Sequence, residues 1–285
     1  MLLAMLALSF FVTTEGGKTV DAGQTASGKG LYPTCPDHPL AGSTKNHTLK
    51  EWIIAGLKAA PISDFPFKRS LFWCDVFPPV TYAALDTYWP PTALMHQDVK
   101  SGRSKKVSHK NAGERFKTSL EDLLQADKNQ KVVKGWAKAK GLWKMLSEVL
   151  FSKEFEAVLW QKMDIKKKWA FRDFRIQTDA KGFAIGAHPD ISKKIATMMF
   201  YLPSGDVEQR KKQASEYGTC LHTKAQFDAR SKVDGATQCA SKFMFLANAG
   251  YTFTVSRNSY HSASAGNYGP RRTIMLNWYN TVWKN

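Results

Sequence analysis

Apolar positions in the first part of the chain recur with helical spacing. Leu49, Ile53 and Leu57 stand four apart, which places them on one face of an amphipathic helix. Thr48 precedes this helix as its predicted N-cap, and Glu51 three residues later completes a capping box. Helices are predicted at 48–60, 80–89, 119–127, 131–151 and 152–163.

The helix predicted at 131–151 carries a single apolar stripe, whose members alternate spacings of four and three. They are Val132, Trp136, Ala139, Trp143, Leu146 and Leu150. We expect this stripe to pack against a sheet rather than to hold a cofactor. The aromatic, proline-punctuated stretch 64–79 predicts a short extended segment, and the polar stretch 97–113 predicts a surface loop.

After about residue 167 the pattern changes to short strand-like runs separated by Gly, Pro and Asn. Many short strands of this kind are typical of a β-sandwich or jelly roll. We therefore predict an α+β chain in which helices support a mainly β core. The predicted strands are 169–178, 182–188, 194–203, 242–250, 251–256 and 272–280, and 204–241 is a long insert.

This pattern also suggests a division of the chain. Residues 1–46 are predicted to be a leader or poorly ordered arm, because Gly, Thr, Ser and Pro dominate from residue 13. Residues 47–165 form the helical support region and 166–285 the jelly-roll core. We expect 47–285 to be one integrated domain.

The net charge is +17, with basic clusters at 102–110, 164–169 and 208–213. An anionic partner is one explanation, and solvated loops that keep the protein soluble are the other, which we favour. Aromatic residues do not interleave with these clusters, and no zinc-finger or RNA-binding motif occurs. Nucleic acid is therefore disfavoured as a partner, and the sequence does not indicate an oligomeric state.

The N-terminal run 1–12 is apolar and has about the length of a signal sequence, but it lacks a basic start and a clear cleavage site. No window approaches 18 uninterrupted apolar residues, so we expect no ordinary transmembrane span. A cytoplasmic location is favoured. The apolar run and the sequon at Asn46 leave the secretory pathway open.

The four cysteines are widely spaced and include no CxxC pair, which disfavours a structural zinc site. Two disulfides are expected in an oxidising compartment and four free thiols in the cytosol, and the sequence does not choose between them. The cysteines are Cys35, Cys74, Cys220 and Cys239.

Two His-x-Asp pairs are candidates for a metal site. His96 and Asp98 precede a polar, basic stretch without a strand pattern, where a ligand would lack a rigid frame. His188 and Asp190 lie between two strand-like runs, so both side chains can point at one ion. His261, also between strand-like runs, is the candidate third ligand if the fold brings it close.

Arg271 and Thr273 follow His261 and stand two apart, so they share a face of a strand. The ordered set of His-x-Asp, a long gap, a distal His and then Arg-x-Thr resembles the Fe(II)/2-oxoglutarate-dependent dioxygenase superfamily. The fragments that carry the resemblance are GAHPD, HPDISKKIATMMFYL, YGTCL and NSYHSA…GPRRTIMLNW. The resemblance covers roughly residues 165–280 and implies a double-stranded β-helix within a jelly roll.

The resemblance also implies the roles of these residues. His188, Asp190 and His261 would bind Fe(II), and two imidazoles with one carboxylate leave three positions open for a chelating 2-oxo acid and O2. Arg271 would bind the far carboxylate of the co-substrate 2-oxoglutarate through a bidentate, charge-assisted pair. The hydroxyl of Thr273 would add a hydrogen bond.

Three neighbouring residues refine this picture. Arg272 competes with Arg271, but the family pattern Gly-x-Arg-x-Ser/Thr selects Arg271 and leaves Arg272 as a surface charge. Tyr201 is a candidate for lining the co-substrate pocket, with a core role equally open. Relatives that halogenate carry a small residue where this chain has Asp190, so hydroxylation, desaturation or ring closure is favoured.

We therefore expect an oxidoreductase that oxidises a C–H bond of a small metabolite, with an anionic one favoured by the charge. A prolyl-type protein hydroxylase is the alternative, although such relatives often hold 2-oxoglutarate with lysine. A nucleic-acid demethylase would carry a second arginine where this chain has Met275, Leu276 and Asn277. A non-catalytic jelly-roll binding module, such as a lectin, is disfavoured because the ligand set is complete and in order.

Overall fold

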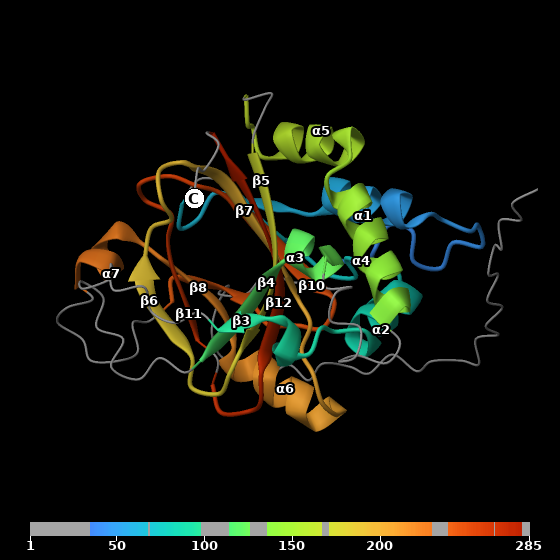
Figure 1. Ribbon diagram of the computed structural model, residues 1–285. Helices are drawn as coiled ribbons and strands as arrows, with labels where there is room; N and C mark the ends of the chain where they lie inside the picture. Colours follow the sequence, from blue (N-terminus) through green and yellow to red (C-terminus); the bar gives the residue numbers. More distant parts are fainter. Residues whose placement is uncertain are drawn as a thin grey trace, which may run out of the picture. The chain divides into compact units, whose positions relative to one another are not determined.

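The computed structural model describes residues 35–67, 69–97, 114–125, 136–166, 171–229, 239–264 and 266–280. All of them belong to one compact unit, 31–285. At its centre two antiparallel sheets face each other, and helices cover the outer side of the larger sheet (Figure 1).

The larger sheet has eight strands in the order β1-β2-β10-β7-β12-β5-β4-β3. In chain order its strands are β1 (Ile62–Ser63), β2 (Ser70–Trp73), β3 (His96–Gln97), β4 (Arg115–Ser119), β5 (Phe171–Asp179), β7 (Lys194–Tyr201), β10 (Ala249–Thr254) and β12 (Arg271–Tyr279). The smaller sheet has the order β6-β11-β8-β9. Its strands are β6 (Ala184–His188), β8 (Gly218–His222), β9 (Ser241–Met244) and β11 (Tyr260–Ser264).

From β5 onward the chain winds back and forth between the two sheets. β5, β7, β10 and β12 lie in the larger sheet, while β6, β8, β9 and β11 lie in the smaller one. This winding is that of a jelly roll. The predicted fold, an α+β chain with a double-stranded β-helix core and a helical support, is confirmed.

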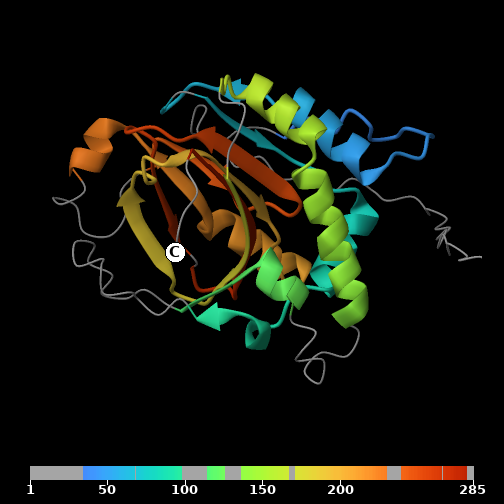
Figure 2. The same ribbon diagram turned by 45° about the horizontal axis from the view of Figure 1, so that its top comes forward.

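The helices are α1 (Leu49–Ala59), α2 (Pro79–Thr87), the 3-10 turn η1 (Thr92–Leu94), α3 (Leu120–Gln125), α4 (Trp136–Leu150), α5 (Lys153–Lys162), α6 (Val207–Glu216) and α7 (Lys224–Ala229). Figures 1 and 2 show α1 and α4 on one side of the larger sheet, with β6, β8 and β11 on the other. The predicted capping box is present, because Thr48 Oγ1 accepts from the Glu51 amide and the Glu51 carboxylate accepts from the Thr48 amide.

Two apolar cores hold these layers together. In the first, Trp143 and Leu146 of the predicted stripe are buried with Ile274 and Leu276 of β12, so the stripe packs on the sheet as expected. In the stripe, Val132 and the side chain of Trp136 lie outside the described residues. The second core lies between the sheets and is rich in aromatic side chains, among them Tyr201, Phe243, Phe245, Tyr251 and Phe253.

The structure corrects several predicted boundaries. The strands predicted at 242–250 and 251–256 are instead β9 and β10, separated by a turn at 245–248. The insert 204–241 contains α6, β8 and α7, and β4 and β11 were not predicted. The expected division at residue 165 is less sharp, because β1 to β4 come from the helical region and join the larger sheet.

Both cysteine pairs are joined as disulfides. Cys35 pairs with Cys74 and Cys220 with Cys239, with Cα–Cα distances of 5.5 and 5.1 Å. These separations fall within the usual range for a bridged pair. In the part of the chain that the structure describes, none of the helices has both the length and the apolar character needed to cross a membrane.

Candidate metal centre

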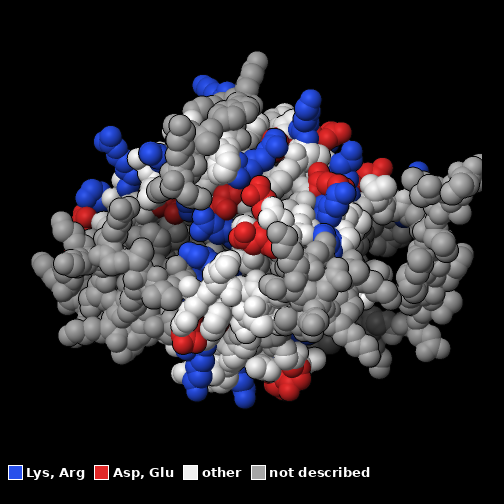
Figure 3. Space-filling view, viewed as in Figure 1, with Lys and Arg blue, Asp and Glu red and all other residues white. Residues whose placement is uncertain are grey.

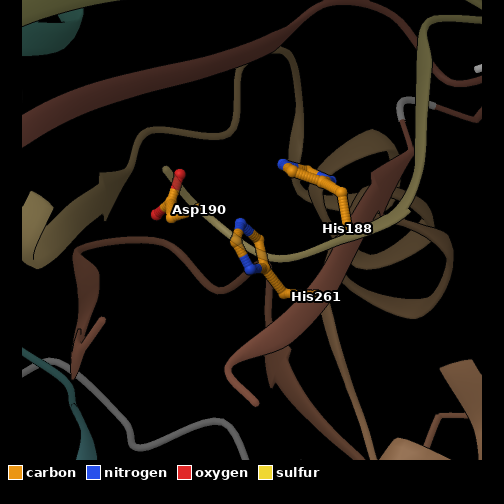
Figure 4. A group of neighbouring side chains, drawn as sticks. All are labelled: His188, Asp190 and His261. Carbon is orange, nitrogen blue, oxygen red and sulfur yellow. The ribbon is translucent and has the colours of Figure 1, made fainter. Parts of the chain in front are cut away.

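The three predicted ligands come together at one end of the smaller sheet. His188 ends β6, Asp190 follows in the turn that leads to β7, and His261 lies on β11. Antiparallel pairing sets His261 directly opposite His188, and their ring centroids are 4.5 Å apart. One ligand atom from each of the three residues lies within 4.8 Å of the others, and the side chains converge on a common space (Figure 4).

Backbone carbonyls fix the orientation of both imidazoles. His188 Nδ1 lies 2.8 Å from the Gly186 carbonyl oxygen, and His261 Nδ1 lies 3.0 Å from that of Ser259. A carbonyl oxygen only accepts, so each Nδ1 carries the hydrogen and donates it. The Nε2 lone pair of each ring is therefore left for a metal ion, an arrangement typical of metal-ligating histidines.

The carboxylate of Asp190 is held from two sides. Lys194 Nζ donates to one oxygen at 2.7 Å, and Thr197 Oγ1 donates to the other at 2.8 Å. Burial acts to raise the pKa of Asp190, but the charge of Lys194, the nearby His261 and these hydrogen bonds outweigh it, so the pKa is lowered. Asp190 is therefore an anion at neutral pH.

His261 is neutral at the same pH. Burial, and then the nearby His188, lower its pKa to about 4. Two imidazoles and one carboxylate on one side of a site are the donor set that non-haem Fe(II) oxygenases use. Within the described ranges, this is the one group of three or more such side chains that could hold a metal ion.

The competing pair does not offer such a frame. His96 lies exposed on the two-residue strand β3. Its partner Asp98 lies outside the described residues, as does the basic cluster 102–110.

A cavity of about 170 Å³ adjoins the metal ligands. His188, Asp190 and His261 line it together with Arg271, which is 1% exposed. The predicted co-substrate arginine therefore lies in the same cavity as the ligands. Other lining residues, which the sequence did not single out for this site, are Arg115, Lys117, Arg175, Gln177, Thr219 and Tyr251.

Two buried donors on β12 have no hydrogen-bond partner among the described residues: Arg271 Nε, from a residue that lines the cavity, and Thr273 Oγ1. They lie two residues apart on β12 and so on the same face. Leaving a buried donor unpaired costs about 1–3 kcal/mol, so such groups usually mark a missing partner. A carboxylate accepts from both, and the residues present therefore fit the 2-oxo dicarboxylic acid that the sequence predicts.

Tyr201 lies in the core, which is the second of the two places that the sequence left open for it. It is fully buried, is not among the residues lining the cavity, and donates to Thr219 Oγ1 at 2.9 Å. The Arg271 guanidinium lies 5.5 Å from its ring centroid. Burial raises the pKa of Tyr201, so it stays a neutral phenol. It supports the Arg271 site from the aromatic core.

The expectation that Arg272 is a surface charge is wrong. Arg272 is 9% exposed, points to the opposite face of β12 and forms an ion pair with Asp86. It also donates to the Leu202 carbonyl at 3.1 Å and lies over the Trp89 ring. Arg272 therefore joins α2 to the larger sheet.

Comparisons with known proteins found similar structures but no similar sequence. No protein-family model and no curated protein matches the chain. Among solved structures, an oxidoreductase of the 2OG-Fe(II) oxygenase family from Burkholderia pseudomallei has 8% identity and a TM-score of 0.47, with 76% of this chain and 87% of that chain covered.

A prolyl-4-hydroxylase from Pseudomonas putida has 9% identity and a TM-score of 0.46, with 80% of this chain and 97% of that one covered. A Trichoplax adhaerens prolyl hydroxylase, solved with a peptide of the hypoxia inducible factor oxygen degradation domain, has 11% identity and a TM-score of 0.47, with 81% and 89% covered.

Proposed function

We propose that this protein is an Fe(II)- and 2-oxoglutarate-dependent dioxygenase that oxidises a C–H bond of its substrate and converts 2-oxoglutarate to succinate. The observation that carries the proposal is one cavity lined both by the His188, Asp190 and His261 cluster and by the buried Arg271. A jelly-roll domain that only binds a ligand would not require a metal-ligand cluster and a buried arginine in one cavity.

Each side chain has a defined part in the proposal. His188, Asp190 and His261 would hold the iron, which with 2-oxoglutarate and O2 supplies the oxidising power for C–H bond cleavage. Arg271 would bind the far carboxylate of 2-oxoglutarate, and the Thr273 hydroxyl would donate to the same group. Lys194 and Thr197 would keep the Asp190 carboxylate charged and oriented.

The charge of the cavity favours a small anionic substrate. Among its described lining residues are five cationic side chains and one carboxylate, Asp190. Lys117 and Arg175 also line a neighbouring cleft of about 760 Å³, so they stand where the two spaces meet. An excess of positive charge in a cleft attracts anions. The larger cleft itself has three cations and three carboxylates among its described lining residues, so the positive excess lies in the smaller cavity, which a substrate would reach past Lys117 and Arg175.

The outer surface gives less support for a large polyanionic partner, such as nucleic acid, than the cavity gives for a small anion. On the face shown in Figure 3, basic and acidic side chains are interspersed over the described surface. In the cluster 208–213, Lys211 pairs with Glu208 and Arg210 with Asp86. This agrees with the solvated-surface explanation of the net charge.

The test is succinate formation from 2-oxoglutarate by protein loaded with Fe(II) without oxygen and then exposed to O2. We expect slow turnover even without a substrate, and none in the double variant His188→Ala, Asp190→Ala. His47→Ala is the matched control, because His47 contacts Ser43 in the loop before α1 and is not part of the site. Equal rates in the double variant and the control would contradict the proposal.

A further inference from the structure

We infer that two arginines, Arg115 and Arg271, bind the far carboxylate of the 2-oxo acid, with Asp179 holding them side by side. This inference rests on the proposed function and specifies its co-substrate site further. Arg115 comes from β4, which lies outside the β5–β12 jelly-roll winding.

The register of three neighbouring strands creates the pair. Arg115 on β4 lies directly opposite Asp179 on β5, and Asp179 lies directly opposite Arg271 on β12. Residues opposite one another on adjacent strands project from the same face of the sheet. The three charges therefore form one row across the larger sheet, on the side that faces the smaller sheet.

Asp179 connects the two guanidinium groups. Arg115 donates to both of its carboxylate oxygens, from Nε at 2.5 Å and from Nη2 at 2.9 Å. Arg271 Nη1 donates to one of the same oxygens at 3.0 Å. Asp179 is fully buried. Planar guanidinium groups fixed in this way keep their remaining N–H donors in a defined direction.

Both arginines line the cavity of the metal centre, whereas Asp179 is not among its lining residues. Asp179 therefore holds them from behind. Arg271 Nη2 also donates weakly to Met199 Sδ at 3.4 Å and to Thr219 Oγ1 at 3.5 Å, which leaves Nε as its donor without a partner. Arg115 is fixed further by Phe183, whose ring centroid is 4.1 Å from the guanidinium carbon. In the same row, Arg271 Nε is buried and has no hydrogen-bond partner among the described residues.

Charge balance supports a second carboxylate at this place. Two guanidinium groups and one carboxylate leave a net charge of +1 in a largely buried row, where Arg115 and Asp179 side chains are 14% and 0% exposed. An uncompensated buried charge is costly. One further carboxylate makes two cations and two anions, and 2-oxo dicarboxylic acids bring that group while 2-oxo monocarboxylic acids do not.

The other explanation is structural: Arg115 would only anchor β4 to β5 through Asp179. The two explanations differ in what they predict for a 2-oxo acid without a far carboxylate. A structural role affects all 2-oxo acids alike, whereas a binding role affects only those with the second carboxylate.

The experiment is calorimetric titration of the Mn(II)-loaded protein, which does not turn over, with 2-oxoglutarate and with 2-oxopentanoate. We expect Arg115→Met to weaken 2-oxoglutarate binding about tenfold or more, equivalent to about 1.4 kcal/mol, and to leave 2-oxopentanoate unchanged. Arg115→Lys keeps the charge and should lose less. Arg210→Met, which removes an ion pair with Asp86 away from the cavity, is the matched control.

The outcomes separate the inference from the proposed function. An equal loss for both acids in Arg115→Met, or no loss for either, overturns the two-arginine site while 2-oxoglutarate binding by the unaltered protein keeps the function intact. No metal-dependent binding of 2-oxoglutarate by the unaltered protein contradicts the function itself. If Arg115→Met fails to fold, the Arg115→Lys variant decides by the same comparison of the two acids.

Discussion

The Thr197 hydroxyl lies between the Asp190 carboxylate of the candidate metal centre and the side chain of Asn277. It is 2.8 Å from the Asp190 carboxylate, to which it donates, and 3.2 Å from Asn277 Oδ1. A side chain that orients a metal-ligating carboxylate contributes to affinity without touching the metal. Thr197 is buried, so water does not readily replace its hydrogen bond.

Replacing Thr197 with Val keeps the shape and removes the hydroxyl. We expect Fe(II) affinity to fall about 10-fold or more, because partners of metal ligands typically contribute 10–100-fold. Titration with Fe(II) under argon measures the change. Thr87→Val, on an exposed helix position, is the control. An affinity equal to that of the control would show that Thr197 does not orient Asp190.

At this scale the sequence predicted the three side chains that come together in the candidate metal centre, and it missed most of their surroundings. His188, Asp190 and Arg271 lie within motifs that can be read locally. Arg115 and Asp179 are visible only through the register of β4, β5 and β12, which no local pattern encodes. Arg175 and Gln177 stand at alternate positions of a predicted strand, a signal that could have placed them on the face of the site.

Substitutions in α4 test how much the packing of the helices on the larger sheet contributes to stability. Leu146 is fully buried against the β12 side of that sheet, whereas its neighbour Met145 is 42% exposed. We expect Leu146→Ala to lower the free energy of unfolding by about 2–5 kcal/mol, through lost burial and a cavity. Met145→Ala should cost much less. Denaturant unfolding of both variants gives the comparison, and equal losses would contradict the packing described.

The start of α1 provides a smaller test. Thr48→Ala removes the capping hydroxyl and is expected to cost about 1 kcal/mol, while Thr48→Ser retains both the hydroxyl and most of the stability. Chemical denaturation measures both. Iron affinity should stay constant in the two variants, since α1 contributes no residue to the metal centre.

The helices of the support region and the apolar strands were predictable at this scale, because their buried faces follow a regular period, whereas α6 and α7 were missed. β4, β8 and β11 were missed for a physical reason. They present polar side chains such as Lys117, Thr219 and His261 to the interior, where these line the cavity. A strand whose inner face forms a polar site lacks the apolar alternation by which strands are recognised.

The two disulfides link residues that are farther apart in the sequence than the length of any helix or strand that the structure describes. They close segments with sequence separations of 39 and 19 residues. Disulfides persist in oxidising compartments, so the pairing favours the secretory alternative that the sequence left open. Asn46, in the exposed loop before α1, is accessible for glycosylation in such a compartment.

Removal of the Cys35–Cys74 link should destabilise the whole molecule. We expect the double variant Cys35→Ser, Cys74→Ser to lose about 2–4 kcal/mol of unfolding free energy. Thiol counting on the unfolded, unreduced protein is the direct check, and four reactive thiols would contradict the pairing.

The central claim concerns the whole molecule: that the jelly roll holds iron and 2-oxoglutarate together for oxidation by O2. The most direct measurement is the isotope content of succinate formed under 18O2 by the Fe(II)-loaded protein. Oxidative decarboxylation of 2-oxoglutarate places one oxygen atom from O2 in the new carboxylate, so we predict succinate that carries one 18O atom. Succinate without the label, or no succinate at all, would contradict the account.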